Sequence, residues 1–287
     1  MEAFIEVLKA VLFGIVEGVT EWLPVSSTGH LILLDEFIHL KVYTDPLQNE
    51  AFMEMFNVVI QLGAILAVVL LFFHKLNPFS PKKDMAQKKS TWQLWFKVVV
   101  AVLPSAVIGL FLDDWMDAHL YNYIVVAIAL ILYGVAFLFV EKLNEKRAVK
   151  ISDVNAIDYR TAILIGAFQC LSLIPGTSRS GATILGAILL GVGRAAGAEF
   201  SFFLAIPTML GASGLKLLGF LKDGVSFNGM SLAVLLVGCA VSFIVSVVVI
   251  RGLMEYVRKR SFSAFGVYRI ALGVLVIGYF VVKSLLI

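Results

Sequence analysis

Residues 23–30 read LPVSSTGH and residues 174–181 read IPGTSRSG. Each of these polar stretches interrupts a long apolar run, the first within residues 4–39 and the second within residues 161–193. Proline lacks a backbone N–H and disfavours helix at the residue before it, and glycine and serine are common in turns. Each run is therefore predicted to form a helical hairpin that is broken at its middle. Inside a membrane, such irregular backbone survives only where it is buried in protein or lines a wet cavity.

The composition of the chain is that of an integral membrane protein. Of its 287 residues, 60% are hydrophobic and 15% are charged, and the mean hydropathy is +0.94. Soluble domains contain about 45–50% apolar and about 25% charged residues. A soluble fold is excluded because too little polar surface remains to cover it. The net charge of +3 is small and the basic residues are dispersed, so no binding of nucleic acid is expected.

Six further apolar stretches are long enough to cross the hydrocarbon core of a bilayer, which takes about 20 helical residues. They cover residues 52–73, 96–112, 121–140, 199–219, 230–250 and 264–286. The predicted fold class is an all-α integral membrane protein that forms one membrane domain over residues 1–287. It contains six transmembrane helices and two broken, re-entrant helical hairpins.

The charges of the connecting segments predict the orientation of the chain. Residues 74–97, 141–160 and 251–260 carry six, five and four lysine or arginine residues respectively. Residues 113–120 instead carry three aspartates, and residues 220–229 carry one lysine and one aspartate. Because cytoplasmic loops are enriched in basic residues, the first three segments are predicted to lie inside and the other two outside. The two hairpins must then enter the membrane from opposite faces.

Residues 1–145 and 155–287 are predicted to be inverted repeats, each one hairpin followed by three spans. The halves match at residues 12–17 (LFGIVE) and 164–169 (LIGAFQ) and, after a one-residue slip, at Pro24 and Pro175 and at Ser27 and Ser178. Inverted repeats with discontinuous helices place a polar site near the midplane, where their broken segments meet. The sequence therefore predicts that the two interrupted stretches share one site.

Two acidic residues lie in the first hairpin, before its break. Glu17 and Glu21 are four residues apart, so they face the same way on a helix. Two buried carboxylates repel each other, and protonation of one, a cationic side chain or a divalent metal would relieve this. Oxygen ligands suit Mg²⁺ or Ca²⁺. The alternative is that both carboxylates reach the membrane interface and bind no ligand.

The break that follows combines hydroxyl groups with an imidazole. If a helix starts after Pro24, both Ser26 and Ser27 share a face with His30. A hydroxyl beside an imidazole is the minimal activated nucleophile. The alternatives are that the serines cap a helix and that His30 is a polar packing residue.

Arg179 lies in the second break, in a turn that opens an apolar helix. Its guanidinium, the neighbouring hydroxyls and the free N–H groups of a helix N-terminus would together form an anion site, for which phosphate is the natural ligand. Alternatively, Arg179 pairs with Glu17 or Glu21 as a structural contact. Arg269 could add a second positive charge to the site, or reach the membrane interface. Gln169 is expected to hydrogen-bond between helices.

These motifs resemble the two signature regions of the undecaprenyl-diphosphate phosphatase (bacitracin-resistance) family. The resemblance rests on Glu17-x-x-x-Glu21, on residues 24–30 and on residues 175–183, and it extends over essentially the whole chain. It implies hydrolysis of undecaprenyl diphosphate to undecaprenyl phosphate and inorganic phosphate, which recycles the bacterial cell-wall lipid carrier. It further implies a homodimer in the inner membrane, a site that opens toward the periplasm, and Mg²⁺ or Ca²⁺ as cofactor.

The resemblance also implies a role for individual residues. Glu17 and Glu21 correspond to the acidic motif that holds the metal or assists proton transfer. Ser27 and His30 correspond to the nucleophile and its acid–base partner, although Ser26, His30 or a water molecule remain alternative nucleophiles. Ser178, Arg179 and Thr183 correspond to the phosphate-binding segment, with Arg179 also catalytic. The neighbouring hydroxyls of Ser26, Thr28 and Ser180 are expected to bind phosphate as well.

A transporter or flippase for a polyprenyl phosphate is the main alternative function. Inverted repeats with broken helices are transporter architecture, and an arginine-lined anion site suits translocation equally well. The Ser27–His30 pair beside two carboxylates favours the enzyme, since transport needs no nucleophile. Phosphatases with a late catalytic histidine are excluded, because no histidine follows His119 in the sequence.

Overall fold

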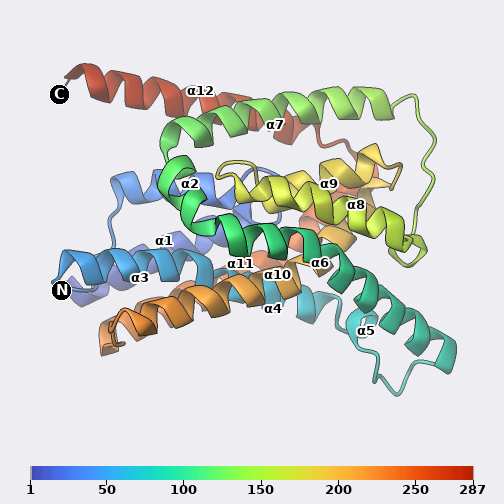
Figure 1. Cartoon of the computed structure of the whole chain (residues 1–287), viewed down its shortest axis with the longest axis horizontal. Helices are drawn as coiled ribbons and strands as arrows, with labels where there is room; N and C mark the ends of the chain where they lie inside the picture. Colours follow the sequence, from blue (N-terminus) through green and yellow to red (C-terminus); the bar gives the residue numbers. More distant parts are fainter. Residues whose placement is uncertain (1, 287) are drawn as a thin grey trace.

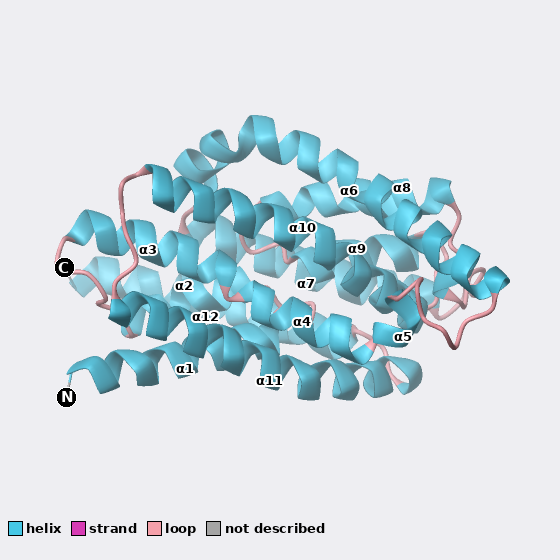
Figure 2. Cartoon of the chain, turned by 90° about the horizontal axis from the view of Figure 1, so that it is seen from below, coloured by secondary structure: helices cyan, strands magenta, loops and turns pink. Residues whose placement is uncertain are grey.

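The computed structural model describes residues 2–286, apart from the side chains of residues 2, 113, 114, 117 and 286. This part of the chain consists of helices joined by short loops and contains no strand (Figure 2). The helices are α1 (Glu2–Thr20), α2 (Ser27–Phe37), α3 (Pro46–Val59), α4 (Gln61–Leu71), α5 (Phe73–Leu76), α6 (Met85–Leu120), α7 (Tyr123–Asn144), α8 (Tyr159–Cys170), α9 (Arg179–Leu189), α10 (Arg194–Lys222), α11 (Gly229–Lys259) and α12 (Ser263–Leu286). Two single 3₁₀ turns, at Val154–Ala156 and Leu171–Leu173, precede and follow α8.

The all-α class and the six membrane spans are confirmed. Six helical segments of the described chain are long and apolar enough to cross a bilayer, so the chain is a multi-pass membrane protein. These segments are Pro46–Leu71, Met85–Leu112, Tyr123–Asn144, Arg194–Lys222, Gly229–Lys259 and Ser263–Leu285.

Several predicted boundaries were too narrow. Residues 113–120 are not a loop, because α6 continues to Leu120, and the three aspartates expected to mark this segment as external have side chains outside the described part. The first span is two helices, α3 and α4, which meet at Ile60. Hydropathy identifies only the apolar centre of a helix, so the predicted spans leave out the polar first and last turns.

The two predicted hairpins are α1–α2 and α8–α9. Figure 1 shows the first toward the end of the molecule that holds both termini and the second toward the opposite end, with their breaks meeting between them. This is the arrangement expected of hairpins that enter from opposite faces. Membrane orientation and the inverted repeat themselves stay predictions.

Glycine allows the hairpins to pack closely against spans of the other half. A Cβ atom on Gly14 of α1 would lie 2.7 Å from the carbonyl oxygen of Gly238 in α11. A Cβ atom on Gly166 of α8 would lie 1.9 Å from the carbonyl oxygen of Ala101 in α6. Small residues of this kind bring membrane helices into direct backbone contact. Each hairpin is therefore anchored through its first helix on a span from the other half of the chain.

Replacement of Gly166 by alanine is expected to destabilise the protein, because the new methyl group would overlap backbone that cannot rotate away. Overpacking of this kind costs roughly 1–3 kcal/mol. Thermal unfolding in detergent measures the effect. Gly214 of α10 is the matched control, since a Cβ atom there has nothing within 4 Å. If Gly166→Ala were as stable as Gly214→Ala, the close contact between α8 and α6 would be wrong.

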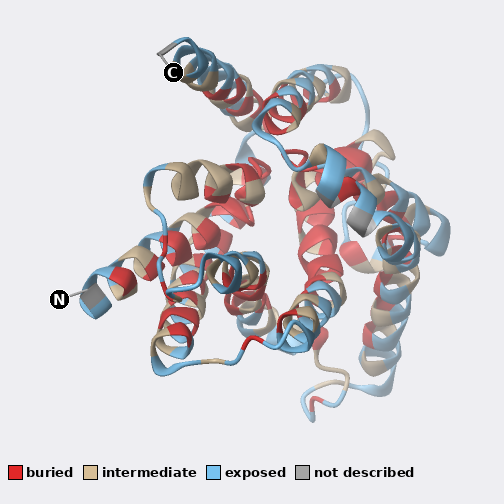
Figure 3. Ribbon diagram, turned by 60° about the vertical axis from the view of Figure 1, so that its left-hand side comes forward, coloured by how far each residue is buried: buried red, intermediate tan, exposed pale blue. Residues whose placement is uncertain are grey.

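The core surrounds α9. Every residue from Ser180 to Ile188 is buried, whereas the long spans are exposed along their outer faces (Figure 3). In a membrane, those outer apolar faces meet lipid. Because α9 is enclosed on all sides, its first residue, Arg179, is held inside the protein.

Candidate active site

The helices that follow the two breaks begin in the same way. Ser26, before α2, has φ 75° and Ser178, before α9, has φ 72°; within the described residues, no other non-glycine residue has a positive φ. Each serine side chain caps its helix by accepting a hydrogen bond, from the N–H of Gly29 (3.2 Å) and of Gly181 (3.1 Å) respectively. Positive φ is costly for serine and is found where surrounding structure enforces it, often at functional sites.

This shared geometry corrects the predicted alignment of the two halves. Ser178 corresponds in local structure to Ser26 and not to Ser27. Ser27 corresponds instead to Arg179, since each is the first residue of its helix. The one-residue slip was wrong because the segment from proline to capping serine is one residue longer in the second break.

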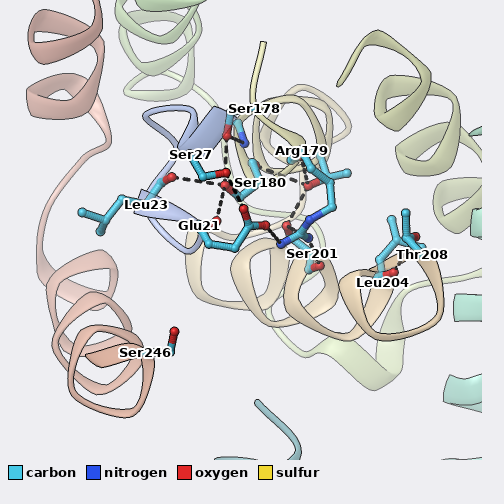
Figure 4. Close-up of polar contacts among 12 residues, drawn as sticks. Glu21, Leu23, Ser27, Ser178, Arg179, Ser180, Ser201, Leu204, Thr208 and Ser246 are labelled. Atoms are coloured by element: carbon cyan, nitrogen blue, oxygen red, sulfur yellow. Dashed lines mark hydrogen bonds and ion pairs between the residues drawn. The ribbon is translucent and has the colours of Figure 1, made fainter. Parts of the chain in front are cut away.

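Glu21 joins the two breaks. Its carboxylate accepts a hydrogen bond from the hydroxyl of Ser27 (2.6 Å) and forms an ion pair with Arg179 (3.1 Å). Figure 4 shows both side chains converging on this carboxylate. Glu21 is only 5% exposed, so water screens these contacts little. The structure thus brings together the predicted acidic residue, the predicted nucleophile and the predicted phosphate-binding arginine.

Two residues that fix Arg179 were not predicted. The guanidinium donates to the backbone oxygen of Ser201 in α10 (2.6 Å) and lies 5.8 Å from the ring centre of Trp22. The hydroxyls of Ser201 and Thr183 are 2.7 Å apart. Ser201 is one of several serines in apolar helices, and nothing in the sequence distinguishes it.

The hydroxyls of the second break hold the loops together. Ser180 donates to the backbone oxygen of Glu21 (3.1 Å) and lies 3.2 Å from that of Leu23. The hydroxyl of Thr183 donates to the backbone oxygen of Arg179 (2.8 Å). Thr28, in the first turn of α2, is partly buried. Ser178, Ser180 and Thr183 therefore have partners within the protein, and a phosphate would have to compete for them.

His30 is not joined to Ser27, contrary to the pairing expected from their spacing. Its Nδ1 lies 2.7 Å from the backbone oxygen of Ser26, and its Nε2 lies 2.7 Å from the hydroxyl of Tyr268 in α12. A backbone oxygen only accepts, so Nδ1 carries a proton, and in the neutral ring Nε2 then accepts from the tyrosine. Ser27 turns the other way, to Glu21.

Glu17 fits a cation. It is fully buried, and neither of its carboxylate oxygens has a hydrogen-bond partner within the described chain. It lies one helical turn before Glu21, whose backbone N–H donates to its backbone oxygen (3.0 Å). Among the described residues, no group of three or more histidine, cysteine, aspartate or glutamate side chains surrounds a common point. Two carboxylates alone suit Mg²⁺, which is commonly held by one or two of them together with substrate phosphates.

Two further predictions have an outcome in the structure. Gln169 forms the expected hydrogen bond between helices, from its Nε2 to the hydroxyl of Ser105 (2.6 Å). Arg269 was expected to add a positive charge to the site or to reach the membrane interface. It does not reach the interface, and it lies against the two breaks that form the site. It is fully buried and donates to backbone oxygens of both breaks.

Comparison with known proteins agrees with the resemblance seen in the motifs. Residues 10–275 match the family described as bacitracin resistance protein BacA. A protein of Enterococcus faecalis named undecaprenyl-diphosphatase is 56% identical over 276 residues, which cover 96% of this chain and 98% of the relative. Proteins with the same name from Lactiplantibacillus plantarum and Limosilactobacillus fermentum are 58% and 59% identical over the same shares. The chain therefore belongs to the bacitracin resistance protein BacA family.

Proposed function

We propose that this protein hydrolyses undecaprenyl diphosphate to undecaprenyl phosphate and inorganic phosphate. The observation that carries the proposal is the buried contact of Glu21 with both Ser27 and Arg179, which places a nucleophile, a proton acceptor and an anion-binding group together. The name shared by the relatives supports this substrate.

Arg179 and the starts of α2 and α9 bind the diphosphate. Both helices direct their first N–H groups toward the break, and a helix N-terminus favours an anion. Without substrate, Glu21 neutralises Arg179. A bound phosphoryl group takes over part of the hydrogen bonding of the guanidinium, and the carboxylate of Glu21 is left to accept the proton of the Ser27 hydroxyl.

The terminal phosphoryl group is transferred to Ser27. The oxygen of Ser27 bonds to the terminal phosphorus as its proton moves to Glu21, and the bond from that phosphorus to the bridging oxygen breaks, which releases undecaprenyl phosphate. A water molecule then attacks the phosphorus of the phosphoserine. The bond from phosphorus to the oxygen of Ser27 breaks as Glu21 returns its proton to that oxygen, and inorganic phosphate leaves with the protons of the water. Both steps depend on positioning and on stabilisation of the phosphoryl oxygens, which Arg179 supplies.

In this scheme, His30 positions the first break and does not take part in the chemistry. Its ring ties the backbone oxygen of Ser26 to Tyr268, and so fixes the start of α2 relative to α12. The direction in which Ser27 points follows from that start. Glu21 therefore replaces His30 as the proton acceptor proposed for Ser27.

We include a divalent cation, Mg²⁺ or Ca²⁺, held by Glu17 and Glu21. When bound, it would offset the negative charge of the diphosphate. Treatment with EDTA is expected to abolish phosphate release, and either metal should restore it. Glu17→Gln should raise the metal concentration needed for half of the maximal rate by about tenfold, since loss of one charged ligand weakens the site by at least ~1.4 kcal/mol. An unchanged rate in EDTA would remove the metal from the proposal.

Release of phosphate from undecaprenyl diphosphate by purified protein in liposomes tests the function. Wild type should release phosphate, and Arg179→Ala should not. If wild type were no faster than this variant, the hydrolase would be wrong. Movement of uncleaved lipid between leaflets in the same liposomes would then support the transporter.

The setting of the enzyme is also part of the proposal. We place it in the bacterial inner membrane as a homodimer, with the site open toward the periplasm and the polyprenyl tail remaining in the bilayer. The loop charges support this orientation, and the resemblance described from the sequence supports the dimer. The mass of the protein in nanodiscs tests the dimer, and labelling of single cysteines in the loops tests the orientation.

A further inference from the structure

Arg269 links the two breaks from a third element. It is the seventh residue of α12 and is fully buried. Its Nη1 donates to the backbone oxygen of Pro24 (3.1 Å), in the first break. Its Nη2 donates to the backbone oxygens of Gly176 (2.7 Å) and Thr177 (2.9 Å), in the second. One guanidinium thus holds segments that are about 150 residues apart in the sequence.

A buried charge in this position is costly. The hydrogen bonds of Arg269 in the described chain go to backbone oxygens and not to acidic side chains, and the ring of Tyr133 lies 5.5 Å from the guanidinium carbon. Removal of a charge from water without a counter-charge is strongly unfavourable. Contact between α12 and α7 does not require it, because the two helices already approach through Gly134 and Gly266, where each Cβ atom would lie within 2.8 Å of the other's oxygen.

The backbone oxygens explain why the charge is kept. The breaks expose backbone groups inside the protein, where unpaired polar groups are costly. Arginine carries five N–H donors in a rigid, planar arrangement and can serve several oxygens at once. Room for it depends on Gly181 of α9, where a Cβ atom would lie 3.1 Å from Nη1.

We propose that Arg269 is a positioning residue for phosphoryl transfer, which sets the two breaks in register so that Ser27 and Arg179 meet at Glu21. Ser27 is three residues beyond Pro24, and Arg179 is two residues beyond Thr177. A shift of one break against the other would therefore separate the nucleophile from the anion-binding group. This inference rests on the proposed function of the same site.

Kinetics of two Arg269 variants test the inference. In Arg269→Met, kcat per folded enzyme should fall by about 100-fold, the effect of a misplacement near 1 Å, and KM should change less. Arg269→Lys keeps the charge, but a single ammonium cannot serve both breaks as Nη1 and Nη2 do, so it should stay below about a tenth of wild type. Arg194→Lys is the matched control. It retains the ion pair with Glu141, which also anchors the N–H of Phe262 just before α12, and should keep wild-type kcat.

A second measurement does not depend on turnover. Trp22 is fully buried beside Arg179, two residues before Pro24. With phenylalanine in place of the other three tryptophans, its fluorescence reports on the first break. Acrylamide should quench it little when Arg269 is present and clearly more in Arg269→Met and Arg269→Lys.

The outcomes separate the two proposals. The positioning role is overturned if Arg269→Lys has wild-type kcat, or if Arg269→Met loses activity only in proportion to the amount of folded protein while Trp22 stays shielded. If wild type itself releases no phosphate, the proposed function fails, and quenching of Trp22 alone then decides whether Arg269 sets the register of the breaks.

Discussion

Ser27→Ala is expected to lose nearly all phosphate release, a fall in kcat of about 1,000-fold or more, as is usual when a covalent nucleophile is removed. The reason is geometric. The hydroxyl of Ser27 is directed at the carboxylate of Glu21 (2.6 Å), so it has a base already in place. KM should change little, because Arg179 and the two helix starts still bind the phosphate. Rates of phosphate release over a range of lipid concentrations give both constants.

Ser26→Ala is the matched control for this variant. Its hydroxyl is adjacent in sequence, but it caps α2 through the N–H of Gly29 and has no contact with Glu21 among the described hydrogen bonds. Loss of a cap typically costs about 1 kcal/mol of stability, so activity should fall only several-fold. An active Ser27→Ala together with an inactive Ser26→Ala would move the nucleophile by one residue.

A trapped intermediate provides a further test of the same prediction. If Ser27 forms a phosphoserine, acid quenching during turnover should leave phosphate on the peptide that contains Ser27, and not in Ser27→Ala. Direct attack by water would leave neither protein labelled. This outcome would retain the site and the products but would remove Ser27 as the nucleophile.

The sequence was sufficient to predict the spans, the hairpins and the meeting of their breaks. Apolar length and interruptions by proline are local features, and a membrane restricts what they can form. The sequence did not predict which residue of one break corresponds to which residue of the other. Whether Ser178 matches Ser26 or Ser27 depends on which serine takes a positive φ, and surrounding structure decides that.

The sequence also did not predict the contacts between segments that are distant in the chain. A spacing of three residues places Ser27 and His30 on one helical face, but does not say which neighbours each side chain finds. His30 turns to Tyr268, which is 238 residues away, and Ser27 turns back to Glu21. The partners of Arg269 were not predicted for the same reason, because they are backbone oxygens, and a pattern of side chains does not show where those oxygens point.

Arg179→Lys is expected to be as damaging as Arg179→Ala, with a fall in kcat of about 100- to 1,000-fold, the usual effect of removing a group that stabilises the transition state. Two different nitrogens of Arg179 contact Glu21 and the backbone oxygen of Ser201. An ammonium is a point charge and cannot hold both while it also binds a phosphoryl group. A lysine variant with more than about a tenth of wild-type kcat would mean that charge alone is required, and not the planar donor set of arginine.

A double variant separates binding of phosphate from neutralisation of Glu21. Removal of Arg179 alone leaves a buried carboxylate without its partner, which is strongly destabilising, by about 3–5 kcal/mol for a fully buried pair. In Glu21→Gln with Arg179→Ala, no charge is left unpaired at this contact, so thermal stability should recover relative to Arg179→Ala. Phosphate release should not recover, because neither the base nor the anion-binding group is present. Since Glu21→Gln alone also lacks the base, its residual rate sets the reference. A double variant as fast as Glu21→Gln would show that Arg179 only balances the charge of Glu21, whereas a slower one would show that the guanidinium acts on the substrate.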